Sequence, residues 1–293
     1  MISKSFWHGK SVLVTGGSSG IGRAIGLAAV ASGGRVGIIA RKRPPLEATL
    51  ADLRARGAIA EAIACDVADA EGLRAAVTML EERLGSCDVA IACAGIHRTS
   101  WPLDAASAGE VIDVNAKGCI NLAAAVLPGM LARRRGSLCG VASIAAVVGL
   151  PGNAAYCASK AAVVAFLESL RLDCQPAGVD ITTACPGVVD TPMVTDAERA
   201  AGRLITAAAA ATLILRGIER GRAEIWFPRR TALAARLARS LPPTIRDWVL
   251  RRQPRMAESS PSELSGSELS GSELSGSESS GSNSSGSESS DRG

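Results

Sequence analysis

The chain has 293 residues, of which 47% are hydrophobic, 20% charged and 3% aromatic, a composition typical of a soluble globular protein with an aliphatic core. A net charge of +4 is too small to indicate a nucleic-acid partner. No apolar run reaches the ~18 residues of a membrane span, and the start of the chain lacks the apolar stretch of a signal peptide, so we expect a cytoplasmic protein.

Eight cysteines are scattered along the chain, none in a Cys-x-x-Cys pair, and only two histidines accompany them. Zinc sites and disulfide frameworks show closer and more regular spacing. We therefore expect no metal site, and we interpret the cysteines as small buried hydrophobic residues in a reducing compartment.

Short apolar runs alternate with longer Ala-, Leu- and Arg-rich stretches as far as residue 227. The alternation predicts the α/β fold class, with a single doubly wound Rossmann-type parallel sheet of about seven strands and helices on both faces. The ligand site of such a sheet lies at the carboxyl ends of its strands. The predicted strands are Ser11–Thr15, Arg35–Ala40, Ile59–Ala64, Asp88–Ala92, Gly136–Ala142, Val179–Ala184 and Glu224–Phe227.

The first predicted strand runs directly into a glycine-rich loop, and a helix-like run follows from Ile21 to Ala31. Glycines let the backbone approach a pyrophosphate, which also gains from the free N–H groups and positive dipole at the start of a helix. A lone glycine-rich loop is often only a turn, but strand, loop and helix together predict nucleotide binding. The predicted contacts are Gly16, Ser18, Ser19, Gly20, Ile21 and Gly22.

The loop spacing Thr-Gly-x-x-x-Gly-x-Gly, which begins at Thr15, resembles that of the short-chain dehydrogenase/reductase family. The resemblance covers roughly residues 10–227 and includes a Tyr-x-x-x-Lys motif at Tyr156 and Lys160. It implies an oxidoreductase with a nicotinamide cofactor, which Tyr156 and Lys160 also contact, and it says little about the substrate.

A basic triplet, Arg41-Lys42-Arg43, follows the second predicted strand, where enzymes that use NAD usually place an acid for the ribose 2′-hydroxyl. A 2′-phosphate favours cationic donors, and the planar fork of an arginine suits it well. The alternative is an ordinary solvated basic loop. The triplet lies at the carboxyl end of the second strand, where the adenosine ribose should bind, and this favours a 2′-phosphate site. We therefore predict NADP(H) rather than NAD(H), with Arg41 as the main contact.

The resemblance also assigns residues after the third and fourth strands. Asp66, next to Val67, would bind the adenine amino group, although an aspartate here is often a helix cap and Asp69 is a candidate for that role. Gly95 would allow close approach to the cofactor. Where the family commonly has Asn-Asn-Ala-Gly, this chain has Ala92-Cys93-Ala94-Gly95, so the side-chain hydrogen bonds of both asparagines are lost.

The predicted chemistry centres on Tyr156 and Lys160, which lie four residues apart and therefore on one face of a helix. A nearby ammonium favours the phenolate and lowers a tyrosine pKa from its usual ~10, which suits a general acid/base at neutral pH. Ser143, at the end of the fifth predicted strand, would polarise the same substrate oxygen. The resemblance adds Asn115, which in relatives holds a water that links the lysine to solvent; a lone helical asparagine is more often a surface residue.

A Pro-Gly segment follows the sixth predicted strand. By resemblance, it runs past the nicotinamide, with Pro186, Gly187, Val189 and Thr191 as cofactor contacts and residues 191–206 as a cover over the substrate. Without the tyrosine and lysine we would interpret it as an ordinary turn.

The C-terminal part departs from this pattern. We predict a catalytic domain over 1–228, a basic helical extension over 229–256 divided by Pro242-Pro243, and a disordered Ser/Gly/Glu repeat tail over 257–293. Because the extension carries eight arginines against Asp247, it either rests weakly on an anionic membrane or packs on the core or a partner subunit. We favour packing.

The prediction is therefore an NADP(H)-dependent oxidoreductase acting on a ketone or secondary alcohol. Because the face of the Tyr156 helix carries small residues, and relatives use this helix for assembly, we expect a homodimer or homotetramer. One alternative is a non-catalytic NADP-binding scaffold or redox sensor. Epimerase or dehydratase chemistry on nucleotide sugars is less favoured, since relatives of that kind are longer.

Overall fold

The computed structural model describes residues 2–98, 101–200, 202 and 204–252, apart from the side chains of residues 197 and 198. The chain divides into two compact units, residues 1–258 and 259–293. The second unit lies outside the described residues, as does the tail predicted to be disordered over 257–293. The account below concerns the first unit.

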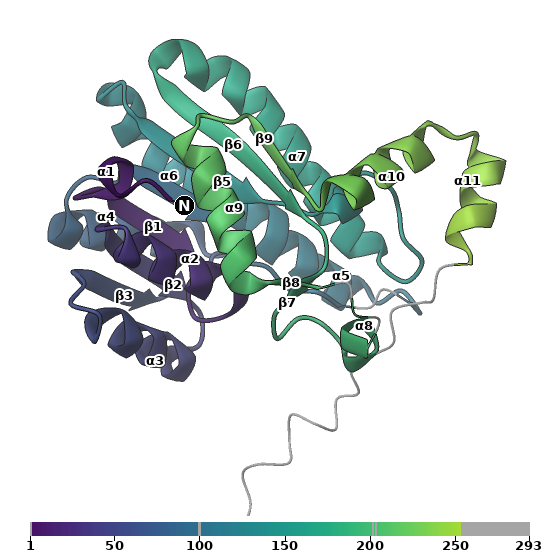
Figure 1. Cartoon of the computed structure of the whole chain (residues 1–293), viewed down its shortest axis with the longest axis horizontal. Coiled ribbons are helices and arrows are strands. Elements are labelled where there is room, and N and C mark those ends of the chain that lie inside the picture. Colours follow the sequence, from purple (N-terminus) through teal and green to yellow (C-terminus); the bar gives the residue numbers. More distant parts are fainter. Residues whose placement is uncertain (1, 99–100, 201, 203, 253–293) are drawn as a thin grey trace, which may run out of the picture. The chain divides into compact units, whose positions relative to one another are not determined.

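A seven-stranded sheet of order β3-β2-β1-β4-β5-β6-β9 forms the centre of the molecule, and every neighbouring pair is parallel (Figure 1). This confirms the doubly wound fold. The strands are β1 (Ser11–Thr15), β2 (Arg35–Ala40), β3 (Ala60–Ala64), β4 (Val89–Ala92), β5 (Gly136–Val141), β6 (Val179–Pro186) and β9 (Glu224–Phe227). They agree with the predicted strands to within two residues at each end.

Helices cover both faces because the strands are apolar on both sides. In β1, Leu13 packs into the core on one face, while Val12 and Val14 pack into the core on the other. The Leu13 side is covered by α4 (Ala70–Leu84), α6 (Gly118–Ala132) and α7 (Ala154–Cys174), and the opposite side by α2 (Gly20–Ala31), α3 (Arg43–Arg54) and α9 (Ala207–Glu219).

The remaining elements are short or lie at the ends of the sheet. They are α1 (Lys4–Trp7), α5 (Ala105–Ile112), the π-helical turn η1 (Asp113–Lys117), the 3₁₀ turns η2 (Ile144–Ala146) and η3 (Gln175–Ala177), α8 (Asp196–Ala200), α10 (Arg229–Ser240) and α11 (Pro243–Leu250). Strands β7 (Val189–Asp190) and β8 (Ile205–Thr206) form a separate two-stranded sheet. The break between α10 and α11 falls at Pro242-Pro243, as the sequence predicts.

The order of the strands positions the site. From β1 the chain continues outward to β2 and β3, whereas β4 lies on the other side of β1 and leads to β5, β6 and β9. The connections after β1 and β4 therefore diverge at the carboxyl edge of the sheet. A crevice at this edge is where doubly wound folds bind their ligands.

One helical run differs from expectation. Residues Ala105–Ala132, which comprise α5, η1 and α6, are together long and apolar enough by composition to cross a membrane, although we expected no such segment. The run lies against the sheet, and 61% of its most apolar window is buried, with Leu122 and Val126 in the core. We interpret it as a core helix of the fold.

Candidate active site

The glycine-rich loop is held tightly against the connection that follows β4. Gly16 has a φ of +70°, and a Cβ there would lie 2.8 Å from the Cα of Ala94, so this position requires glycine. The hydroxyl of Thr15 accepts hydrogen bonds of 3.2 Å from the backbone N–H groups of both Cys93 and Ala94. The Thr15 hydroxyl thus holds together the two connections that line the crevice.

The first turn of α2 is available to an anion. Its N-cap residue, Ser19, makes no side-chain capping bond, so the hydroxyl does not occupy the N–H groups at the helix start. A Cβ at Gly20 would lie 3.0 Å from the Cγ2 of Thr191, which places the Pro-Gly segment beside this turn. Ser18, Ile21 and Gly22 belong to the same loop and turn. This arrangement fits the pyrophosphate of a dinucleotide.

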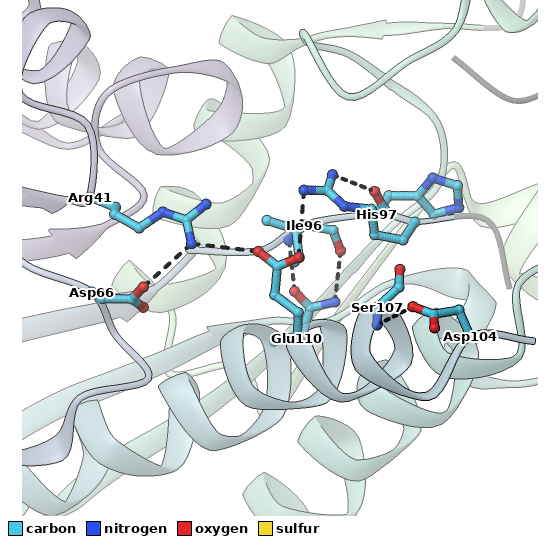
Figure 2. Close-up of polar contacts among 9 residues, drawn as sticks. Arg41, Asp66, Ile96, His97, Asp104, Ser107 and Glu110 are labelled. Atoms are coloured by element: carbon cyan, nitrogen blue, oxygen red, sulfur yellow. Dashed lines mark hydrogen bonds and ion pairs between the residues drawn. The ribbon is translucent and has the colours of Figure 1, made fainter. Parts of the chain in front are cut away.

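Arg41 directly follows β2, and its half-exposed guanidinium reaches toward the connection after β3 and toward α5. Its Nη1 is 3.4 Å from Asp66 Oδ2 and 3.5 Å from Glu110 Oε1, and Arg98 also pairs with Glu110 at 3.6 Å. Figure 2 shows the guanidinium between the two carboxylates. The Arg41 side chain is 50% exposed and the two acids 36% and 37%, so each pair contributes little stability. Sequence reasoning missed Glu110, which lies on α5.

Asp66 and Asp69 take separate roles. Asp69 caps α4 by accepting a 3.0 Å bond from Gly72 N–H, whereas Asp66 accepts a 3.0 Å bond from Ala68 N–H in the connection after β3. Asn121 of α6 donates to the carbonyl of Val67 at 2.8 Å. The Asp66–Val67 backbone is therefore fixed from two sides, and the second Asp66 oxygen faces Arg41.

Three predicted residues converge where the connection after β4 meets α7. A Cβ at Gly95 would lie 3.2 Å from Asn115 Oδ1 and 3.4 Å from Lys160 Nζ. Asn115 accepts from Ile96 N–H at 2.7 Å and donates to Ile96 O and to Ser159 Oγ, both at 3.0 Å. Asn115 thus fixes this connection against α7 in a buried position, which differs from the common surface asparagine.

Lys160 is an almost fully buried cation with an exposed fraction of 5%. Its Nζ donates to Val141 O at 2.9 Å, and among the described residues it forms no ion pair. Burial lowers its pKa from 10.5, because the charged form is desolvated. Its neighbours are thiols instead of carboxylates, and burial raises the pKa of Cys119 and Cys185 to about 12. These thiols are therefore protonated at neutral pH.

Tyr156 lies one helical turn before Lys160 on α7, and Lys160 Nζ is 5.8 Å from the centre of its ring. Ser143 follows β5 as the N-cap of η2, where its Oγ accepts a 3.1 Å bond from Ala145 N–H. A hydroxyl that accepts one N–H bond retains its own proton for donation. Ser143, Tyr156 and Lys160 thus come from two elements at the carboxyl edge of the sheet.

A histidine that sequence reasoning missed lies against Tyr156. The rings of His97 and Tyr156 meet edge to face, with centroids 5.1 Å apart and an interplanar angle of 78°. Asn153, the N-cap residue of α7, donates to Pro151 O at 2.9 Å, which turns its amide oxygen toward His97 Nε2. A lone His in the sequence gave no signal of this contact.

The Pro-Gly segment closes the site. Gly187 N–H donates to Phe227 O at 2.7 Å, and Val189 pairs with Ile205 in the small sheet. Arg199 of α8 donates to the carbonyl of Thr191 at 2.8 Å and also pairs with Asp190. Pro186, Gly187, Val189 and Thr191 thus lie between the end of β6 and the residue that follows β7.

Comparison with known proteins identifies the family. The sequence profile described as short chain dehydrogenase matches residues 10–202. The chain belongs to the short-chain dehydrogenase family. A curated relative, named as an uncharacterized oxidoreductase of Myxococcus xanthus (strain DK1622), is 36% identical over 245 residues, which are 83% of this chain and 97% of the relative. Family membership makes the chain an oxidoreductase that binds a nicotinamide cofactor.

Two solved short-chain dehydrogenases show the same fold. Actinorhodin polyketide ketoreductase (a single-substitution variant, with NADPH) has a TM-score of 0.69 and 28% identity, covering 78% of this chain and 97% of its own. A short-chain dehydrogenase/reductase from Burkholderia phymatum in complex with NAD has a TM-score of 0.74 and 25% identity, covering 86% and 99%. One neighbour holds NADPH and the other NAD, so the family alone leaves the choice of cofactor open.

Proposed function

We propose that this short-chain dehydrogenase transfers a hydride between NADP(H) and a ketone or secondary alcohol, with Tyr156 as general acid/base. The observation that carries the proposal is the buried Lys160 ammonium, 5.8 Å from the Tyr156 ring and bonded to no acid among the described residues. A positive charge without a counter-ion stabilises a phenolate nearby. The ketoreductase likeness is consistent with a carbonyl substrate.

In the proposed mechanism the bound nicotinamide supplies or accepts the hydride. Tyr156 gives its phenolic proton to the substrate oxygen during reduction and takes it back during oxidation. The Ser143 hydroxyl donates to the same oxygen and holds it in place. Lys160 stabilises the Tyr156 phenolate that remains. Asn115 holds the backbone at Ile96 and the Ser159 side chain in position beside Lys160.

The cofactor would lie along the residues described above. The loop from Gly16 to Gly22 and the start of α2 suit the pyrophosphate, Asp66 and Val67 the adenine, and Pro186 to Thr191 the nicotinamide end. Arg41 supports NADP(H) over NAD(H), because it directly follows β2 and presents a half-exposed guanidinium at the carboxyl edge of the sheet.

Substitution of Arg41 tests the preference. We expect Arg41→Gln to lower kcat/KM for NADPH by about 10- to 100-fold, because the variant loses a charge-assisted pair with the 2′-phosphate, and to change kcat/KM for NADH less than about twofold. Arg74→Gln, which removes an exposed arginine of α4, is the matched control. Steady-state kinetics with both cofactors provide the measurement. Equal losses with NADPH and NADH would contradict the assignment.

His97 offers a second test. An edge-to-face contact between two rings, such as that of His97 with Tyr156, contributes ~0.5–1.5 kcal/mol. Because the Tyr156 ring loses this restraint in His97→Ala, we expect the variant to lower kcat by about 2- to 10-fold. NADPH affinity, measured by fluorescence titration, should stay unchanged. His97→Phe keeps a ring at this position and should recover most of kcat. An unchanged kcat in His97→Ala would show that the contact has no role in turnover.

The thiols argue against the alternative of a redox sensor. Reactive cysteines have a lowered pKa and access to solvent. Here burial raises the pKa of Cys93, Cys119 and Cys185 to about 12. A non-catalytic NADP-binding scaffold remains distinguishable from an enzyme by turnover alone.

The exposed face of α7 supports a homodimer or homotetramer. Ala158, Ala162 and Ala165 lie exposed at spacings that share one face, so another helix can approach closely. We propose assembly through α7 and, since members of the family act on small molecules, a small carbonyl or alcohol substrate in each subunit. We propose a cytoplasmic location.

An NADPH-oxidation screen tests the proposed function. The panel comprises steroids, long-chain keto lipids, sugars and acyl ketones, with NADH run in parallel. Turnover of at least one ketone with NADPH would support the proposal. Tight NADPH binding with no turnover across the panel would favour the scaffold.

A further inference from the structure

An apolar stripe on α10 has no partner among the described residues. Leu233 and Leu237 are four residues apart, which places them on one face of the helix, and Leu241 follows four residues later as the C-cap residue. Leu233 and Leu237 are 59% and 60% exposed, an unusual state for two neighbouring leucines. Ala232 is the residue of α10 that is buried against the protein, and Arg236, beside the stripe, pairs with Glu224 of β9 at 3.0 Å and lies 4.4 Å from the Trp226 ring. The stripe therefore faces away from the body of the protein.

The next helix continues this surface. In α11, Ile245, Trp248 and Val249 are exposed at spacings of three and four residues, and Leu250 is the residue of this helix that is buried. Arg252 lies over the Trp248 ring at 3.4 Å. Figure 1 shows α10 beside β9, with α11 further out from the sheet. We call the exposed side chains of α10 and α11 the basic-apolar surface.

The charge of this surface is one-sided. Seven arginines lie between residues 229 and 252, against one acid, Asp247. Arg236 pairs with Glu224, and Arg246 pairs with Asp247 at 3.7 Å. The others form no ion pair with any described residue: Arg229, Arg230, Arg239, Arg251 and Arg252. Leucine, isoleucine and tryptophan surrounded by unpaired arginines match the chemistry of a bilayer surface with anionic headgroups.

Two other occupants fit less well. If the basic-apolar surfaces of two copies of the chain met, the unpaired arginines of one copy would face those of the other, and like charges repel. The chain's own segment 257–293 is acidic, but its leucines recur every five residues, whereas the stripe on α10 recurs every four. Ordering that Ser- and Gly-rich segment would also cost much conformational entropy.

We propose that α10 and α11 dock the protein on an anionic lipid bilayer. Leu233, Leu237 and Trp248 insert at the level of the headgroups, and the unpaired arginines contact lipid phosphates. The sequence alone favours packing of the whole extension on the core or on a partner subunit. In the structure only one face of α10 packs on the core, so the proposal differs from that expectation. It is independent of the proposed oxidoreductase activity.

Flotation of the full-length protein with vesicles tests the proposal. We expect binding at low salt to phosphatidylcholine vesicles that contain phosphatidylglycerol, little binding to phosphatidylcholine alone, and release as the salt concentration rises. Leu237→Ser should weaken binding about tenfold, and Arg230→Gln about fivefold. Ile59→Ser, which removes an apolar side chain just before β3 that is 61% exposed, is the control and should bind as wild type.

Several outcomes would overturn the proposal. Absence of wild-type binding to anionic vesicles at low salt would do so, as would equal binding by Leu237→Ser and wild type. If vesicles bind only the full-length variant Glu263→Gln/Glu268→Gln/Glu273→Gln, the chain's own acidic segment occupies the surface. If Leu237→Ser instead lowers the sedimentation mass without vesicles, the occupant is a second copy.

Discussion

Replacing Tyr156 with phenylalanine is expected to lower kcat for ketone reduction by about 10²- to 10⁴-fold, the range typical for loss of a general acid. The substitution removes the hydroxyl and keeps the ring, so the edge contact with His97 and the fold of α7 are retained. NADPH affinity should change by less than about threefold. Steady-state kinetics on any ketone found in the screen, together with fluorescence titration of NADPH, measure both quantities.

The control for this experiment is Thr78→Val, which removes an exposed hydroxyl of α4 that donates to the Arg74 carbonyl. It should leave both quantities unchanged. If Tyr156→Phe kept more than about a tenth of the wild-type kcat, the proton donor would be another group, and the role proposed for Tyr156 would be wrong. If instead it lost NADPH binding, the result would report a damaged site.

Lys160→Met is expected to lower kcat by at least about 10²-fold, because the phenolate loses its stabilising charge while the buried volume stays similar. The Val141 carbonyl loses its donor, so some stability is lost as well. A loss of kcat below about threefold would contradict the role proposed for Lys160.

The same variant also gives a result that does not depend on activity. Because burial lowers the pKa of Lys160 from 10.5, the folded protein binds this proton less tightly than the unfolded chain does. Below the folded-state pKa, the buried ammonium destabilises the folded protein by its whole desolvation free energy. This destabilisation disappears as the pH rises to 10.5. The unfolding free energy of the wild type should therefore rise relative to Lys160→Met over that range. Chemical denaturation of both proteins at neutral pH and at pH values up to 10.5 measures the difference between their unfolding free energies. A difference that stays constant over this range would refute the lowered pKa of Lys160.

Local patterns in the sequence were sufficient to predict the sheet, the glycine loop and the helical turn that carries Tyr156 and Lys160. Each depends on residues close together in the chain: alternating apolar runs, glycine spacing, and an interval of four residues. The strand ends shifted by one or two residues, as at Ile59, whose side chain is exposed.

Contacts between distant elements were not predictable in this way. Glu110 meets Arg41 across 69 positions, and His97 meets Asn153 across 56. No periodicity links such pairs, and each residue alone resembles an ordinary surface residue. The Thr15 hydroxyl was visible in the loop motif, but its two acceptor bonds depend on β4 lying beside β1, which only the order of the strands reveals.

The position of Arg41 between Asp66 and Glu110 has a consequence for how a nucleotide is chosen. The two carboxylates lie 3.4 and 3.5 Å from the guanidinium, so a phosphate that approaches Arg41 approaches both of them as well. They also repel an incoming phosphate, and they must give up their partner to it. Under the role proposed for Arg41, selectivity at this position would be a small difference between attraction and repulsion. Discrimination between the two nucleotides would accordingly be set by three side chains from distant parts of the chain, and a change in one of the acids would alter it while the arginine stays in place.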